Sequence, residues 1–421
     1  MRYPALEKLH QKKIALLGLG LDNQSLLALL KKHKIKSEVT IKDFRQDPKY
    51  FNKNLDKFDI LFRSPGWPIS CPGIQEALKK GKTRLSSPLN LFMEICPTKN
   101  IIGVTGTKGK GTTASLIYKI LKDAGKKVWL GGNIGIAPLG FIDKIKPSDY
   151  VVLELSSFQL EDLKLSPRLA VITNLYKEHL APADPNNPNF HASYSKYWQA
   201  KLNIARQKSN QYLIASQSLK NRLAKTDLPG KIIYFSPSQA PSKLIGNYNQ
   251  ENIGAALEVA KVLKISEKIA LKSITKFSNL EHRLEFVKEI NGVRYFDNSF
   301  STTPESTVLD LKSFNDPLIQ IAGGADKGAN FLTLAKTIKQ KVKFLILLPG
   351  AGSEKIKKEL KKQNFPTNKL QLVNDMSEAV KYAKREASSG DIVLLSTACA
   401  SFGIFKNYKE RGDLFKKYVR E

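Results

Sequence analysis

The sequence predicts an α/β protein built from three successive units, and two features support this prediction. Short apolar segments alternate with helical patterns along the chain, beginning with the run from residue 13 to residue 66. This alternation is typical of strands joined by crossover helices in a parallel sheet. The length of 421 residues also exceeds that of one ordinary domain. We therefore expect several sheets whose ligand sites lie at strand ends.

The apolar segments fall into three series along the chain. We place the first unit at residues 1–97 and the second at 98–278, which opens with the apolar run 101–106. The third unit, 279–421, contains four further strand candidates. The Pro- and Asn-rich stretch 181–190 is a loop by composition.

The net charge of +30, from 68 Lys and Arg against 38 Asp and Glu, raises the question of a nucleic-acid partner. Only 12 of the cations are arginines, the residues best suited to bidentate contacts with phosphates and guanine, and they are scattered. The lysines of residues 354–362 are spaced around apolar residues, as on a solvated helix face. We therefore expect small anionic substrates and no nucleic acid, and keep a basic nucleic-acid-binding ATPase as the alternative from another class.

The sequence contains no recognisable secretory signal or membrane span. The first apolar run begins at Ile14 and is broken by Gly18 and Gly20. No segment reaches the roughly 18 consecutive apolar residues that a span requires. The cysteines are widely spaced and fit no metal-ligand pattern: Cys71, Cys96 and Cys399. We expect reduced, buried thiols in a soluble, cytoplasmic and monomeric protein.

Residues 104–113, VTGTKGKGTT, form a candidate phosphate-binding loop between a strand and a helix that we expect to begin near Thr112. Gly106 and Gly109 permit backbone angles that turn several N–H groups inward, and Lys110 can meet phosphate oxygens. The loop departs from the strict P-loop pattern at Val104 and Gly111, so that the hydroxyl for Mg²⁺ comes one position late, at Thr112. The alternative is a glycine turn with incidental lysines.

A second glycine-rich turn, GLGLDN at residues 18–23, follows the first strand. Asp43, at the end of the next strand, stands where a dinucleotide site would have an acidic residue. Asn23 occupies the place of the third glycine of the fingerprint. A nucleotide-phosphate site and a structural turn are therefore both open.

Three further polar residues lie where ligand-facing groups of a parallel sheet are found, and each has a structural alternative. Glu154 interrupts an apolar strand, where a carboxylate needs a partner such as a metal ion, unless it reaches water at the strand end. His179 follows another strand end, although a lone histidine is more often structural. Lys201 lies in the aromatic-flanked helical run YWQAKLNI and, taken alone, indicates a surface lysine.

The motifs, in their order along nearly the whole chain, resemble those of the Mur ligase family. They are GTKGKGT, GGNIG (131–135), ELSSFQLE, YWQAKL, GNYNQENIGAA (246–256), EHRLE (281–285), GGADKG (323–328) and STACASFGIFKNYKERG (396–412). The resemblance implies a Rossmann-like N-terminal domain for a UDP moiety, a central P-loop-type ATPase domain with a mostly parallel sheet, and a Rossmann-like C-terminal domain for an amino acid.

The resemblance also implies a reaction, namely ATP-dependent amide formation between UDP-N-acetylmuramoyl-L-alanine and D-glutamate through an acyl phosphate, in peptidoglycan precursor synthesis. ELSSFQLE and the C-terminal ACASF favour the glutamate-adding members over sister ligases. The N-terminal GLGLDN and RSPG favour them over folylpolyglutamate synthases, which lack such a domain. Another amide ligase of the superfamily stays the alternative.

The chemistry requires cations around the transferring phosphoryl group, because a carboxylate and a triphosphate repel each other. The resemblance implies two Mg²⁺ ions, one held by Thr112 and Glu154 and one near His179. It also implies that Lys201 carries a CO₂-derived carbamate, which would turn a cation into an anionic metal ligand.

The remaining site residues are carried over from the family in three groups. The ATP site is expected to comprise Gly106, Thr107, Lys108, Gly109, Lys110, Gly111, Thr112, Thr113, Asn249, Asn252, Arg283 and either Asp297 or Asn298. The UDP-substrate site is expected to comprise Leu21, Asp22, Asp43, Arg45, Ser64, Gly66, Asn133 and His179. The D-glutamate site is expected to comprise Thr302, Lys327, Ser401, Phe402 and Tyr408.

Two departures from the family concern charge. In DNSFST (297–302), Phe300 stands where a lysine is usual, and the acidic residue expected at the ribose is Asp297 shifted by one place or is replaced by Asn298. Asp22 replaces a common threonine beside the uridine site, where an acid near diphosphate is unfavourable unless it faces a sugar hydroxyl.

Overall fold

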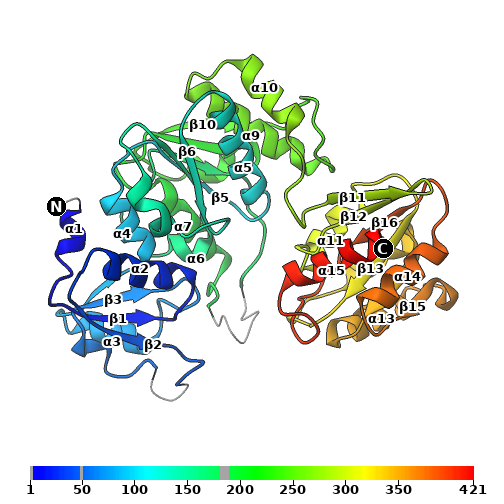
Figure 1. The fold of residues 1–421 in the computed structure, drawn as a ribbon, viewed down its shortest axis with the longest axis horizontal. Helices are drawn as coiled ribbons and strands as arrows, with labels where there is room; N and C mark the ends of the chain where they lie inside the picture. Colours follow the sequence, from blue (N-terminus) through cyan, green and yellow to red (C-terminus); the bar gives the residue numbers. More distant parts are fainter. Residues whose placement is uncertain (1–2, 48–50, 181–188) are drawn as a thin grey trace. The chain divides into compact units, whose positions relative to one another are not determined.

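The computed structural model describes residues 3–47, 51–180 and 189–421, and they form two compact units (Figure 1). One unit contains residues 1–241 with 248–275, and the other contains 242–247 with 276–421. The first unit holds two sheets and the second holds one. The three predicted series of strands therefore appear as three sheets, while the domain boundaries near residues 97 and 278 stay predictions.

The N-terminal sheet has four parallel strands in the order β2-β1-β3-β4. Its central strand β1 buries every residue after Lys13, as expected of a strand covered on both faces. The strands are β1 Lys13–Leu17, β2 Glu38–Lys42, β3 Ile60–Arg63 and β4 Arg84–Ser86, and the helices are α1 Pro4–Glu7, α2 Leu21–Lys32, α3 Pro72–Lys79 and α4 Pro88–Ile95, with the 3₁₀ turn η1 Leu55–Lys57.

The central sheet has six parallel strands in the order β10-β9-β8-β5-β7-β6. The strands are β5 Ile101–Thr105, β6 Val128–Gly132, β7 Tyr150–Glu154, β8 Leu169–Ile172, β9 Tyr212–Ser216 and β10 Lys231–Phe235. The helices are α5 Lys110–Asp123, α6 Ser157–Leu160, α7 Tyr194–Leu202, α8 Lys220–Leu223, α9 Tyr248–Val262 and α10 Glu267–Lys276, with 3₁₀ turns η2 Pro138–Lys144, η3 Asn203–Ala205 and η4 Gln217–Leu219.

The C-terminal sheet has six strands in the order β11-β12-β16-β13-β14-β15, of which only β11 runs antiparallel to its neighbour. The strands are β11 Glu285–Ile290, β12 Val293–Asp297, β13 Leu318–Gly323, β14 Val342–Leu348, β15 Leu370–Leu372 and β16 Ile392–Leu395. The helices are α11 Pro304–Leu311, α12 Leu332–Lys341, α13 Ala351–Lys362, α14 Met376–Glu386 and α15 Tyr408–Arg420, with the 3₁₀ turn η5 Thr367–Lys369.

Most sequence-based expectations about the elements are confirmed. Helix α5 begins at Lys110 rather than near Thr112. Most of the expected loop 181–190 lies outside the described residues. The three cysteines are free and buried, as expected. Within the described ranges, no helix is long and apolar enough to cross a membrane.

Candidate active site

The phosphate loop connects β5 to α5 and depends on two glycines. Gly106 has φ +146°, and a Cβ atom there would lie 1.9 Å from the Thr173 hydroxyl oxygen. Gly109 has φ +80°, and a Cβ atom there would lie 2.0 Å from Oδ1 of Asn252. These positions are closed to other residues both by conformation and by space. The loop is therefore a built feature of the fold, packed against the strand end after β8 and against α9.

Hydrogen bonds from neighbouring elements fix the loop backbone. Asn174 accepts from the Lys108 backbone N–H through its side-chain oxygen at 2.8 Å and from the Thr107 N–H through its carbonyl at 3.1 Å. The Lys110 ammonium donates to the Thr107 carbonyl at 2.9 Å, beside the N-terminus of α5. A lysine and a helix N-terminus at one glycine loop form an anion-binding arrangement.

The predicted nucleotide residues Thr113 and Asn252 contact each other. Thr113 donates its hydroxyl to Oδ1 of Asn252 at 3.2 Å, and the Asn252 amide donates to Oδ1 of Asn249 at 2.7 Å. Gly111 is buried and Thr112 is half-buried in the first turn of α5. Thr113 thus connects α5 to α9. Thr112, the other threonine of this turn, is only half-buried, so its hydroxyl is the better candidate for a ligand contact.

Glu154 is the last residue of β7, next to the strand that leads into the phosphate loop. Its Oε1 accepts a weak hydrogen bond from the Asn133 amide at 3.3 Å, so two predicted site residues are brought together. Its Oε2 is buried and has no hydrogen-bond partner in the described parts of the chain. A buried carboxylate oxygen without a partner is costly unless a cation completes it. This oxygen therefore fits the expected Mg²⁺ ligand, since magnesium prefers carboxylate oxygen.

Lys201 is buried, so the interpretation of a surface lysine is wrong. Its Nζ donates to the Gly106 carbonyl at 2.6 Å and lies 4.5 Å from the centroid of the Tyr197 ring. Burial, together with the nearby Lys110, holds the pKa of the Lys201 ammonium well below its usual range. The side chain is therefore a candidate neutral amine, the form that reacts with CO₂.

His179 lies beyond the end of β8 in the left-handed conformation, with φ +58°. Its ring contacts Phe158 of α6 edge-on, with 5.0 Å between ring centroids. Burial, with Lys110 and Lys201 nearby, lowers the pKa of His179 to about 4 against the opposing charge of Glu178. His179 is therefore neutral near pH 7, and one ring nitrogen keeps a lone pair with which it can bind a metal ion.

Glu178 and Lys108 form an ion pair at 2.9 Å that joins the phosphate loop to the stretch carrying His179. Burial opposes ionisation of Glu178, but Lys108, His179 and Lys110 together lower its pKa to about 2. The sequence interpretation named Lys108 as a phosphate residue and did not identify this partner.

His191 is a buried site residue that sequence reasoning missed. Its Nε2 lies 2.9 Å from the Ser157 hydroxyl oxygen and its Nδ1 lies 3.3 Å from Oε1 of Glu161. Burial, with His179, Lys201 and Arg63 nearby, lowers the pKa of His191 to about 4. The stretch FHAS resembles an ordinary loop end, so no sequence signal marked it.

The depressed pKa of His191 predicts a pH-dependent stability. In the unfolded chain His191 takes up a proton below pH 6.5, whereas in the folded chain it does so only near pH 4. The contribution of neutral His191 to the free energy of unfolding is therefore complete above pH 6.5 and is lost as the pH falls towards 4. At about 1.4 kcal/mol per pKa unit, the loss is roughly 3 kcal/mol.

The measurement is urea unfolding of the wild type and of His191→Asn between pH 4 and 7. The free energy of unfolding of the wild type should fall more steeply with acid than that of the variant. Variant His10→Asn, at a partly exposed position, serves as the control and should follow the wild type. Parallel curves for the wild type and His191→Asn would contradict the prediction.

In the N-terminal sheet, Asp43 and Arg45 form a bidentate pair beside the glycine turn. Arg45 donates to Asp43 at 2.9 and 2.6 Å, and Asp43 also accepts from the Leu19 backbone N–H at 3.1 Å. These bonds hold the pKa of Asp43 well below its usual range. The predicted residues Ser64 and Gly66 follow β3, and a Cβ atom on Gly18 would lie 2.5 Å from the Ser64 hydroxyl oxygen. The glycine turn at residues 18–23 is thus adjacent to residues 64–66, which we call the SPG loop.

Asn23 replaces the third glycine of the fingerprint and has a structural role. Its amide nitrogen donates to the carbonyls of Leu17, Gly18 and Phe62 at 3.4, 2.7 and 3.2 Å. These bonds connect α2 to β1 and β3. A glycine at this position has no side chain and could bring the helix and strands together only by close backbone packing. Leu21, also predicted at the UDP site, is exposed.

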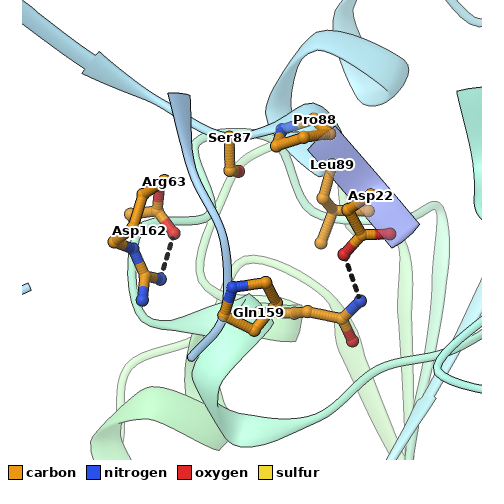
Figure 2. A pocket seen from close by; sticks show the side chains of 8 residues that line it. Asp22, Arg63, Ser87, Pro88, Leu89, Gln159 and Asp162 are labelled. Carbon is orange, nitrogen blue, oxygen red and sulfur yellow. Dashed lines mark hydrogen bonds and ion pairs between the residues drawn. The ribbon is translucent and has the colours of Figure 1, made fainter. Parts of the chain in front are cut away.

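Asp22 points into a small cavity and faces Gln159 (Figure 2). The Gln159 amide donates to Asp22 at 3.3 Å, while its carbonyl oxygen accepts from the Ser156 N–H as part of the capping box of α6. Burial raises the pKa of Asp22, although the Gln159 bond opposes this shift. The acid is thus engaged by an amide of α6. The cavity is lined by Asp22, Arg63, Pro65, Ser87, Pro88, Leu89, Gln159 and Asp162.

In the C-terminal unit, Asp297 is fully buried and its carboxylate is engaged. It lies 2.6 Å from Nδ1 of His282 and accepts from the Ser299 backbone N–H at 2.8 Å. Asn298, the other residue predicted at the ribose, is also buried.

Phe300, which stands where the family has lysine, packs under the guanidinium of Arg283 with 3.5 Å between Cζ and the ring centroid. Tyr408, at the start of α15, meets the Phe300 ring edge-on at 5.1 Å. Lys327 lies over the Phe402 ring at 5.7 Å, while Ser401 is buried and Thr302 is half-buried. Two of the predicted glutamate residues, Lys327 and Phe402, thus contact each other, while a third, Tyr408, contacts Phe300 beneath Arg283. A cation lies over an aromatic ring in both groups.

Comparisons with known proteins agree with these features. The Mur ligase middle domain matches residues 104–238, and the Mur ligase, glutamate ligase domain matches residues 282–399. The UDP-N-acetylmuramoylalanine--D-glutamate ligase of Acetivibrio thermocellus is 37% identical over 98% of this chain and 97% of its own. The chain belongs to the Mur ligase family.

Two further similarities concern the sequence and the fold, respectively. The ligase of the same name from Clostridium kluyveri is 36% identical to this Mur ligase, over 97% of each chain. The structure of the MurF ligase from Thermotoga maritima in complex with ADP has a TM-score of 0.61 at 15% identity, over 99% of this chain and 96% of that one. At that identity the second similarity speaks for the fold alone.

Proposed function

We propose that this Mur ligase joins D-glutamate to UDP-N-acetylmuramoyl-L-alanine at the expense of ATP, in the cytoplasmic synthesis of peptidoglycan precursors. The observation that carries the proposal is the 36–37% identity, over nearly the full length, to ligases of that name. It is combined with a phosphate loop, a buried Lys201 and a buried Glu154 oxygen that has no hydrogen-bond partner among the residues the structure describes. Residues 1–97 would bind the UDP substrate, 98–278 ATP, and 279–421 D-glutamate. We expect a monomer.

The reaction has two steps. A carboxylate oxygen of the muramoyl substrate attacks the γ-phosphorus of ATP, which forms an acyl phosphate and releases ADP. The amine of D-glutamate then attacks the acyl carbon, loses a proton, and displaces inorganic phosphate to leave the amide. The protein must hold the two anions together and keep water away from the acyl phosphate.

The residues of the central sheet suit the first step. Lys110 and the N-terminus of α5 bring positive charge to the loop, as phosphoryl transfer requires. Thr112, Glu154, His179 and a carbamylated Lys201 are the proposed ligands of two Mg²⁺ ions, which would supply further positive charge next to the transferring group. Asn133 and His179 would contact the muramoyl substrate.

The test is phosphate release from ATP with Mg²⁺ and UDP-N-acetylmuramoyl-L-alanine, with D-glutamate, L-glutamate, another amino acid or no acceptor. Release that needs both the muramoyl substrate and D-glutamate is expected, and it should disappear in Lys110→Ala. Variant Lys119→Ala removes a lysine of the same helix that pairs with Asp123 and should keep full activity. Dependence on a different amino acid would overturn the D-glutamate assignment and leave the phosphate chemistry standing.

A further inference from the structure

His191 is bonded directly to His179 through the backbone. The His191 backbone N–H donates to the His179 carbonyl at 2.8 Å. The left-handed conformation of His179 is not one that its side chain favours, so surrounding contacts must maintain it. The bond from His191 is one such contact.

The His191 side chain is held from three directions by α6 and the residue after it. Its two nitrogens contact Ser157 and Glu161, and its ring stacks on Phe158 with centroids 4.8 Å apart and planes 7° apart. Phe158 is also the residue that meets the His179 ring. His191 therefore aligns both the backbone and the ring environment of His179.

The same network reaches the N-terminal sheet. Arg63, buried at the end of β3, donates to Glu161 at 3.1 Å. It also donates to Asp162 at 2.7 Å (Figure 2). Asn189, two residues before His191, donates to the Pro65 carbonyl at 2.8 Å. Arg63 and Pro65 flank Ser64 of the SPG loop, which is expected to contact the UDP end of the substrate. A continuous set of contacts thus leads from the SPG loop through Glu161 and His191 to His179.

The Ser157–His191–Glu161 arrangement also has the composition of a nucleophilic triad, but its burial excludes that role. Ser157 and His191 are each 3% exposed, and Phe158 covers the imidazole face. A substrate carbonyl would have no path to the hydroxyl oxygen, as nucleophilic catalysis requires.

We infer that His191 is a positioning residue that fixes His179 relative to the SPG loop, and so aligns the two ends of the UDP-muramoyl substrate. This inference rests on the proposed function, because it assigns both ends of the network to one substrate. The consequence is selective: loss of His191 should impair binding and turnover of the muramoyl substrate and spare ATP, whose loop is held by Asn174 and Asn252.

The test compares three variants. His191→Phe keeps a ring against Phe158 but removes both hydrogen bonds, His191→Asn retains a donor near Glu161, and Ser157→Ala removes only the serine bond. We expect His191→Phe to raise KM for UDP-N-acetylmuramoyl-L-alanine and to lower kcat. The ratio kcat/KM should fall by about 10-fold to 100-fold, as happens when a substrate is slightly misplaced. KM for ATP should stay within about 2-fold, and His191→Asn should recover part of the loss. His10→Phe is the control.

A spectroscopic readout separates this inference from the proposed function. With only five histidines in the chain, ¹³C-labelled histidine resonances can be assigned by substitution. The His179 resonance should shift in His191→Phe, and that of His282 should not. An unchanged His179 resonance, or equal losses for both substrates in a folded variant, would overturn the inference. Should His191→Phe not fold, His191→Asn and Ser157→Ala decide by the same criteria. A wild type without ligase activity would defeat the proposed function, while the resonance would still test the positioning.

Discussion

Glutamine in place of Glu154 is expected to remove most of the ligase activity without destabilising the protein. The carboxylate is buried at the end of β7, receives one weak hydrogen bond from Asn133, and leaves Oε2 without a partner in the described residues. A neutral isostere relieves the cost of burying that charge, so the free energy of unfolding measured without Mg²⁺ should stay constant or rise. Phosphate release should fall by about 10²-fold to 10³-fold, as when one stabilising group at a developing charge is lost.

A second buried carboxylate, on the residue directly before β7, provides the matched control. Asp149 accepts from the Trp129 indole at 2.9 Å and from the Lys146 backbone N–H at 3.1 Å, so its charge is used structurally. Asp149→Asn should lower the free energy of unfolding by about 1 to 3 kcal/mol, the range for hydrogen bonds to charged groups, and leave activity near wild type. Strong destabilisation by Glu154→Gln in the absence of metal would contradict the prediction, because it would reveal a structural role.

The strands that carry the candidate site were predictable because they run parallel to their neighbours and are buried on both faces. Runs such as Ile101–Thr105 and Tyr150–Glu154 are continuous and apolar, and the glycine loop and Glu154 stand at their ends. Strand β11, which pairs antiparallel with β12, was not predicted. Its signal was present: Asn291 and Gly292, both with positive φ, form the dipeptide turn between two alternating segments.

Burial and long-range contacts were not predictable in the same way. Lys201 has the local sequence of a surface lysine, and only the packing of α7 against the phosphate loop places its amine on the Gly106 carbonyl. His191 acquires its partners from α6, 34 and 30 positions earlier in the chain, so nothing next to it in sequence marks it. Asp297, the last residue of β12, takes His282 as its partner, 15 positions earlier in the chain, so nothing next to it in sequence marks this contact.

Methionine in place of Lys201 is expected to abolish turnover while preserving the fold. The amine is buried with the Gly106 carbonyl and the Tyr197 ring around it, and its pKa is held well below the usual range by burial and by Lys110. A neutral buried amine can attack CO₂, which forms an N–C bond and releases a proton. The resulting carbamate is an anion near Lys110, where a second cationic lysine would be unfavourable. A methionine of similar length fills the space but cannot form it.

Two measurements together test this assignment. Enzyme incubated with ¹³C-bicarbonate should show a carbamate resonance that is absent from Lys201→Met, and activity of the wild type should fall after removal of CO₂ and return with bicarbonate. Lys196→Met, at an exposed position of the same helix, should behave as the wild type in both. Phosphate release in Lys201→Met should be lower by about 10²-fold or more, the cost of losing a group that organises charge at the reacting phosphoryl. Full activity in Lys201→Met would exclude any role for this side chain. Loss of activity without a carbamate signal or bicarbonate dependence would exclude the carbamate. The neutral amine itself would then serve the site.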